Sequence, residues 1–168
     1  MIKDILSPLS CAGCRLCCSF DKYEIWQTPT ISRELKERIQ RSFPHIGFTE
    51  NGSSGSYLFD MRDTWDEERE LFLCPALDPR KGCILGDDKP FECRIWPYKA
   101  MDLNGTLVIS IDPICREMYE KPLSVLVGEL EKITEGDKTL EEYIYGEAEK
   151  TPALVKPCEK GFPILKVR

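Results

Sequence analysis

Residues 11–18 read CAGCRLCC and place four thiols, Cys11, Cys14, Cys17 and Cys18, within eight positions. A hydrophobic core does not require cysteines to be crowded in this way. Two residues between cysteines let both sulfurs converge on one metal centre, and Gly13 eases the turn between the first two. The segment therefore predicts a thiolate metal site, and the rest of the fold is interpreted around it.

The spacing C-x2-C-x2-C resembles the loops that wrap a cubane iron–sulfur cluster. The adjacent pair Cys17 and Cys18 is expected to diverge, because neighbouring side chains point apart in a strand or on a helix. Two centres, or one polynuclear cluster, explain the pair better than a single mononuclear ion. A strained vicinal disulfide, or a buried Cys18 that binds nothing, are the alternatives.

Further cysteines continue the pattern in CPALDPRKGCILGDDKPFEC, residues 74–93, and in DPIC, residues 112–115, whereas Cys158 stands apart. Thiolate ligation concentrates negative charge, which a nearby guanidinium offsets. Arg94 follows a cysteine in CRIWPY and is the arginine expected to support the metal. The predicted ligands are Cys11, Cys14, Cys17, Cys18, Cys74, Cys83, Cys93 and Cys115.

The single histidine, His45, lies far from every cysteine in the sequence and is expected at the surface. A mixed Cys2His2 zinc finger is therefore excluded, and a zinc site would rely on thiolates, alone or with a carboxylate. Catalysis by a Cys–His pair would depend on this one residue, and the sequence identifies no catalytic residue.

Composition and charge narrow the class of protein. The formal net charge is −6, with 29 acidic against 23 basic residues, which argues against nucleic acid or an anionic membrane as a partner. No apolar run is long enough to span a membrane, and the first residues do not resemble a signal peptide. A cytoplasmic protein is expected, and in that reducing compartment nine cysteines favour metal ligation over disulfides.

Secondary-structure patterns predict a small α+β protein, a single domain over residues 1–168. Apolar residues four apart predict a helix within 30–43, and YLFDMR and ELFLC read as strands, the second leading to Cys74. Asn-Gly between two runs of strand formers predicts a hairpin over 98–111. The expected architecture is a short antiparallel sheet with flanking helices and long loops pinned by metal, the segment 74–97 being irregular.

The chain beyond the motif core, 11–115, is expected to be helical and then extended, over 116–168. In PLSVLVGELEKI, residues 122–133, an apolar face is predicted from Leu123, Leu126 or Val127, Leu130 and Ile133. A second, acidic helix is predicted in TLEEYIYGEAEK, and the proline-containing tail from Thr151 is expected to be extended.

CAGCRLCC followed by CPALDPRKGCILGDDKPFECRIWPY resembles the CxxCxxCC, or YkgJ-type, cysteine cluster family, which is described as a zinc- or iron-chelating domain. The resemblance covers roughly residues 11–115, with Lys89 where an arginine is usual. The family includes the flagellin lysine N-methylases, which are considerably longer. This chain has neither G-x-G-x-x-G nor a P-loop, so the resemblance implies metal chelation more strongly than any reaction.

Three functions follow from these patterns. The first is a protein with a thiolate-ligated iron–sulfur cluster, of the 4Fe–4S type, used for electron transfer, sensing or structure, together with a redox or other protein partner. The second is an all-cysteine zinc scaffold for a protein partner. The third is a metal-dependent enzyme that modifies a protein, as the resemblance to flagellin lysine N-methylases implies.

Replacing single cysteines by serine tests the predicted ligands. Cys14→Ser and Cys93→Ser should each lower both bound metal and thermal stability, because metal ligation helps to order the loops. Cys158→Ser is the control and should change neither quantity. Metal analysis and thermal unfolding of the purified variants give the answer, and unchanged metal content in Cys93→Ser would contradict the assignment of that ligand.

Overall fold

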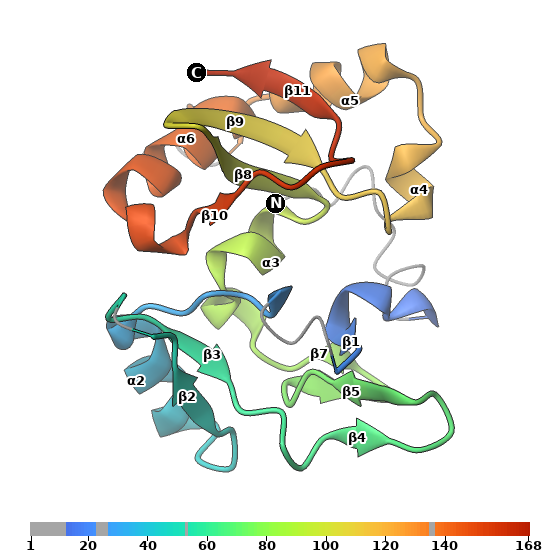
Figure 1. Ribbon diagram of the computed structural model, residues 1–168, viewed down its shortest axis with the longest axis vertical. Helices are drawn as coiled ribbons and strands as arrows, with labels where there is room; N and C mark the ends of the chain where they lie inside the picture. Colours follow the sequence, from blue (N-terminus) through green and yellow to red (C-terminus); the bar gives the residue numbers. More distant parts are fainter. Residues whose placement is uncertain (1–12, 23–26, 53, 135–136) are drawn as a thin grey trace. The chain divides into compact units, whose positions relative to one another are not determined.

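A computed structural model describes residues 13–22, 27–52, 54–134 and 137–168 (Figure 1). Its helices and short, mostly antiparallel sheets confirm the predicted α+β class. The described residues fall into two compact units, 13–91 and Glu92–Arg168, which are considered separately. The boundary lies inside the segment 11–115, which the sequence analysis treats as one motif core.

Helix α2 (Arg33–Ser42) confirms the amphipathic pattern in the first unit. It begins at Ser32, whose hydroxyl accepts a hydrogen bond from the Leu35 amide at 3.2 Å and so satisfies one of the exposed amides of the first turn. Leu35 and Ile39 are buried one turn apart. The helix ends before Pro44, because proline cannot donate the hydrogen bond that would continue it.

A hydrophobic cluster holds α2 against strands β2 (Phe48–Glu50) and β3 (Tyr57–Phe59), which pair antiparallel. Strand β3 confirms the strand predicted in YLFDMR. The rings of Phe48 and Phe59 lie 5.5 Å apart. Cys74 and Cys83 pack against the same cluster, so two predicted ligands lie at the border of the first unit's core.

The segment 74–97 is more regular than predicted. It contains the paired strands β6 (Leu77–Asp78) and β7 (Gly82–Cys83), a 3₁₀ turn at Gly86–Asp88 and helix α3 (Phe91–Ile95). Proline, glycine and aspartate suggested an irregular loop, but here they form the turns between very short elements.

The second unit is built on the predicted hairpin, which strands β8 (Tyr98–Leu103) and β9 (Thr106–Ile111) form in register. Asn104 and Gly105 make the turn with φ of 52° and 87°. Positive φ at both positions is what a two-residue turn between antiparallel strands requires, and asparagine and glycine tolerate it best. The Asn-Gly pair and the strand formers on either side of it were therefore enough to predict this hairpin.

The tail after Thr151 is docked on the hairpin. Strand β10 (Lys156–Pro157) pairs parallel with β8, and β11 (Ile164–Val167) pairs antiparallel with β9, giving the order β10-β8-β9-β11. The predicted extended tail thus contributes both outer strands of a mixed sheet.

Helices α5 (Leu123–Leu130) and α6 (Leu140–Lys150) pack against this sheet and against each other (Figure 1). The buried Tyr98 hydroxyl donates to the Leu126 carbonyl at 2.8 Å and ties β8 to α5. The apolar face predicted for α5 is only half right. Leu126 and Leu130 are buried, whereas Leu123 is 62% exposed at the first turn and Ile133, beyond the helix end, is 73% exposed.

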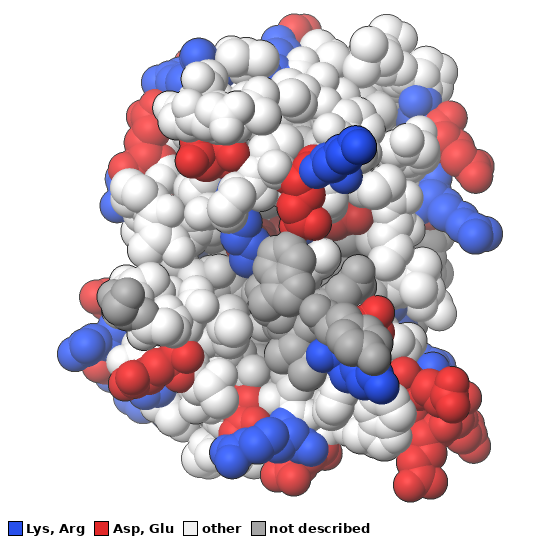
Figure 2. Space-filling view, viewed as in Figure 1, with Lys and Arg blue, Asp and Glu red and all other residues white. Residues whose placement is uncertain are grey.

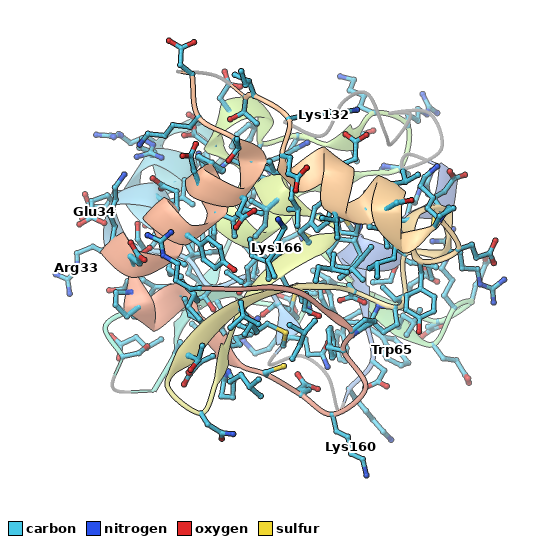
Figure 3. The ribbon with its side chains drawn as sticks, turned by 90° about the horizontal axis from the view of Figure 1, so that it is seen from above. Arg33, Glu34, Trp65, Lys132, Lys160 and Lys166 are labelled. Carbon is cyan, nitrogen blue, oxygen red and sulfur yellow. The ribbon has the colours of Figure 1, made fainter. Side chains whose placement is uncertain are left out.

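Lys166 on β11 connects three elements through charge. Its ammonium lies 3.2 Å from Glu131, just beyond α5, and 3.1 Å from Glu141 on α6 (Figure 3). These pairs raise the pKa of Lys166 above its ordinary value, first through the hydrogen bond to Glu141. Both carboxylates therefore favour the ammonium form and fix the edge strand against the helices.

None of the helices within the described ranges is long and apolar enough to cross a lipid bilayer.

The capping box of α6 generates a stability prediction. Thr139 accepts from the Glu142 amide at 3.1 Å while Glu142 accepts from the Thr139 amide at 2.8 Å. Thr139→Ala should lower the free energy of unfolding by about 1 kcal/mol, because the helix loses its capping oxygen. Thr139→Ser keeps that oxygen and should stay close to the parent chain in chemical denaturation. Equal losses in both variants would show that the cap contributes nothing.

Candidate metal centre

The described part of CAGCRLCC ends in a tight turn. Arg15 adopts a left-handed conformation, with φ of 58°, directly before the 3₁₀ helix η1 (Leu16–Cys18). Its carbonyl accepts hydrogen bonds from the Cys18 amide at 2.9 Å and from the Ser19 hydroxyl at 3.1 Å. The turn is therefore closed by two hydrogen bonds on one oxygen, and it delivers the chain into strand β1 (Ser19–Phe20).

Cys17 and Cys18 do not diverge as the sequence analysis expected. Their sulfur atoms lie 3.9 Å apart, since the backbone changes from a 3₁₀ turn to an extended strand directly after Cys18. Neither of the regular geometries on which the expectation was based applies to the pair. The hydrogen bond with Cys18, followed by burial, raises the pKa of the Cys17 thiol well above its ordinary value.

Strand pairing brings Cys74 to this turn. Strand β1 pairs antiparallel with β5 (Leu71–Leu73), the strand predicted in ELFLC, and β4 (Trp65–Asp66) pairs on the other side of β5. At the end of the ladder the Cys74 amide donates to the Cys18 carbonyl at 2.8 Å. Burial raises the pKa of the Cys74 thiol to about 12, and the neighbouring Cys83 and Cys17 thiols add to this shift.

The β6–β7 hairpin brings Cys83 toward the same place, because Cys83 pairs with Leu77, whose amide donates to the Cys74 carbonyl at 2.9 Å. Asp78 accepts two backbone amides of the intervening turn, both at 2.8 Å. The Arg15 guanidinium donates to the Pro79 carbonyl and so ties this turn to the first one. Three backbone segments of the first unit therefore carry four thiols into one region: Cys17, Cys18, Cys74 and Cys83.

The structure does not bring the other two predicted ligands of the first unit into this group. Cys14 is exposed, and Cys11 lies outside the described residues. Lys89 follows the 3₁₀ turn at Gly86–Asp88, and its positive charge acts on the Cys17 thiol. The family usually has an arginine at this position, and the lysine of this chain carries the same charge.

In the second unit, α3 carries Cys93 and Arg94. Cys93 is exposed. Arg94 has its guanidinium 6.0 Å from the Tyr143 ring, and its buried Nε has no hydrogen-bond partner among the described residues. A buried guanidinium nitrogen without an acceptor is costly. A buried guanidinium donor of this kind is suited to a negatively charged acceptor.

Cys115 follows a turn built by a buried ion pair. Asp112 binds Lys99 at 2.9 Å, and its side chain accepts the Ile114 amide at 3.0 Å. The Lys99 ammonium also lies 4.9 Å from the Phe162 ring. Asp112 was not among the predicted site residues, and carboxylates in loops are usually solvated. The structure instead buries it as the residue that shapes the turn leading to Cys115, and no local pattern reveals the distant Lys99.

His45 and Cys158 were not predicted as ligands, and only the surface position of His45 was predicted. His45 is exposed beyond α2. Cys158 follows β10, and its amide donates to the Asp102 carbonyl at 2.7 Å.

The spacing of the thiols bears on whether they can hold a metal. Across the four described ranges there is no group of three or more His, Cys, Asp or Glu side chains arranged to hold a metal ion. Two sulfurs are nevertheless correctly spaced, because metal–sulfur bonds of about 2.3 Å put two tetrahedral ligands about 3.8 Å apart. The Cys17 and Cys18 sulfurs, 3.9 Å apart, come close to this spacing, but no third side chain in the described ranges joins them in a metal-holding group.

No protein-family model, curated protein or solved structure matches this chain.

The Lys99–Asp112 pair generates a prediction for the Cys115 turn. Asp112→Ala should lower the free energy of unfolding by about 3 kcal/mol, since it leaves a mostly buried ammonium without its carboxylate. Lys99→Met should cost less, because methionine keeps the contact with Phe162. The double variant should cost less than the sum of the two single variants in chemical denaturation. Strict additivity would show that the two charges do not interact.

Proposed function

We propose that this protein binds metal through its cysteines and carries a thiolate-ligated iron–sulfur cluster, of the 4Fe–4S type, that serves electron transfer, sensing or structure. The observation that carries the proposal is the hydrogen bond from the Cys74 amide to the Cys18 carbonyl. It joins two cysteine-containing segments that are far apart in the sequence. It extends the β1–β5 ladder by one bond, so the Cys18 and Cys74 residues lie side by side on neighbouring segments.

The surroundings of the thiols support a metal-binding role. Cys74 and Cys83 pack against the hydrophobic cluster, which limits the access of water, and water access tunes the potential of a cluster. Lys89 places a positive charge near Cys17, and Arg94 offers a buried donor in the second unit. Cations of this kind offset the negative charge of thiolates.

The motif adds a second line of support. Cys11, Cys14, Cys17 and Cys18, with Cys74, Cys83 and Cys93, follow the pattern of the CxxCxxCC family, and we propose that the chain is a member. Ligand cysteines must stay reduced, so we also propose that the protein works in the cytoplasm.

An all-cysteine zinc scaffold for a protein partner is the second candidate. The separation of 3.9 Å between the Cys17 and Cys18 sulfurs favours it, because two ligands of one tetrahedral zinc ion lie about this far apart.

The distribution of surface charge helps to decide which class of partner the protein binds. Figure 2 shows acidic and basic side chains interspersed on the face in view. With a net charge of −6, this distribution favours a protein or redox partner over nucleic acid, which is bound through concentrated basic surface.

Metal analysis of the full chain, purified without oxygen, tests the proposal. Iron with matching acid-labile sulfide and a broad absorption band at about 400 nm is expected for a thiolate-bound cluster. Colourless protein with stoichiometric zinc would replace the cluster by the zinc scaffold. Protein that takes up neither metal, while Cys158→Ser and the parent chain are equally folded, would contradict metal binding altogether.

A further inference from the structure

We propose that the β4–β5 hairpin of the first unit is a docking surface for an extended, cationic segment of a partner protein. The hairpin consists of β4 (Trp65–Asp66), β5 (Leu71–Leu73) and the turn that joins them. An exposed tryptophan on an edge strand and a group of unpaired carboxylates meet in this short stretch of chain. Docking here requires no metal at the thiols, so it goes beyond the proposed metal-binding function.

Trp65 is a large aromatic residue that the fold leaves accessible and yet holds in place (Figure 3). It is 44% exposed, and its ring contacts the edge of the Phe72 ring on the neighbouring strand, with 4.9 Å between the ring centroids. A ring that is already fixed by such a contact loses little conformational entropy when a partner binds. Tryptophan is also among the residues that most often dominate the binding energy of an interface.

Strand β4 is the edge strand on one side of its sheet. The order β1-β5-β4 places β5 on one side of β4, and no described strand pairs with the other side. Backbone N–H and C=O groups along an open edge can pair with an extended segment of another protein. Because β4 has only two residues, backbone pairing alone gives few hydrogen bonds, and the side chains must provide most of the affinity and the selectivity.

The side chains around Trp65 concentrate negative charge. Residues 63–70 read DTWDEERE, with five carboxylates against one arginine and thus a net charge of −4. That arginine, Arg69, is already paired with Asp66 at 3.8 Å. Figure 2 shows acidic side chains grouped at the lower right, where the β4–β5 turn lies in Figure 1. Three exposed glutamates of the turn form no ion pair with any described residue: Glu67, Glu68 and Glu70.

The backbone at Glu70 adds to this picture. Glu70 has a φ of 54°, in the left-handed region that favours glycine or asparagine. The turn of the second unit has those two residues, Asn104 and Gly105, at its positions of positive φ. Glycine at position 70 would remove the strain together with the charge. Glu70 therefore contributes to the negative potential of the turn while it lowers local stability.

The charge selects a cationic occupant for the edge and the exposed ring. A lysine or arginine of an extended segment can lie over the face of Trp65, since cation–π attraction is strongest with tryptophan. Single exposed ion pairs contribute little, but several unpaired carboxylates together attract and orient a cationic segment and repel an acidic one. The hairpin therefore fits a strand of a partner protein that bears lysine or arginine.

Binding of a synthetic peptide of alternating lysine and valine to the full chain tests this proposal. The indole N–H resonance of Trp65, identified by its loss in Trp65→Phe, should shift on titration, and added salt should weaken binding through screening. Trp65→Ala should weaken the affinity about tenfold, as expected for an aromatic anchor. An unmoved Trp65 resonance, or equal binding of the matching glutamate–valine peptide, would overturn the proposal.

Two charge reversals of equal size separate a local surface from general attraction to an acidic chain. Glu67→Lys/Glu68→Lys should abolish binding of the lysine–valine peptide. The matched control, Glu117→Lys/Glu120→Lys, reverses two exposed charges at α4 (Arg116–Tyr119) and should bind the peptide like the parent chain. All four side chains are exposed, so both variants should keep the parent's thermal unfolding temperature. Equal loss of affinity in the two variants would show that only net charge matters and would overturn the docking surface, while the proposed metal binding would stand.

Discussion

The pairing of β1 with β5, completed by the hydrogen bond from Cys74 to Cys18, is the constraint on which the candidate centre depends. It fixes where the first cysteine segment lies relative to the second, and the β6–β7 hairpin then adds Cys83 by pairing of its own. Each of these ladders is only two or three residues long, and ladders this short are marginal on their own. A metal bound by the thiols they carry would supply free energy that the backbone alone does not.

Local signals predicted the elements whose geometry is local. The hairpin at Asn104-Gly105 and helix α2 were predicted because turn chemistry and apolar spacing each lie within a few residues. The predicted face of α5 was partly wrong, since periodicity cannot tell which end of a helix extends beyond the sheet, and Leu123 is exposed there. Sequence spacing likewise could not show how close two adjacent thiols come at a turn.

Long-range pairing was the part that no local pattern contained. Nothing near Asp112 in the sequence indicates Lys99, and nothing near Cys18 indicates that Cys74 will donate to its carbonyl. The number and spacing of the cysteines predict metal binding, and metal binding stays a proposal. The grouping of Cys17, Cys18, Cys74 and Cys83 needed the strand register, and register depends on pairing between distant segments.

The order of strands in the second unit has a consequence for synthesis and aggregation. The hairpin β8–β9 lies in the middle of its sheet, and both outer strands come from the last residues of the chain. Until these residues have left the ribosome, the hairpin has two open edges that can pair with another chain, and the β9 edge is rich in valine and isoleucine. Pro157 and Lys166 in the outer strands are residues that discourage such pairing. Strands β10 and β11 therefore cover the open edges of β8 and β9. Removing them would expose edges that can form intermolecular sheets.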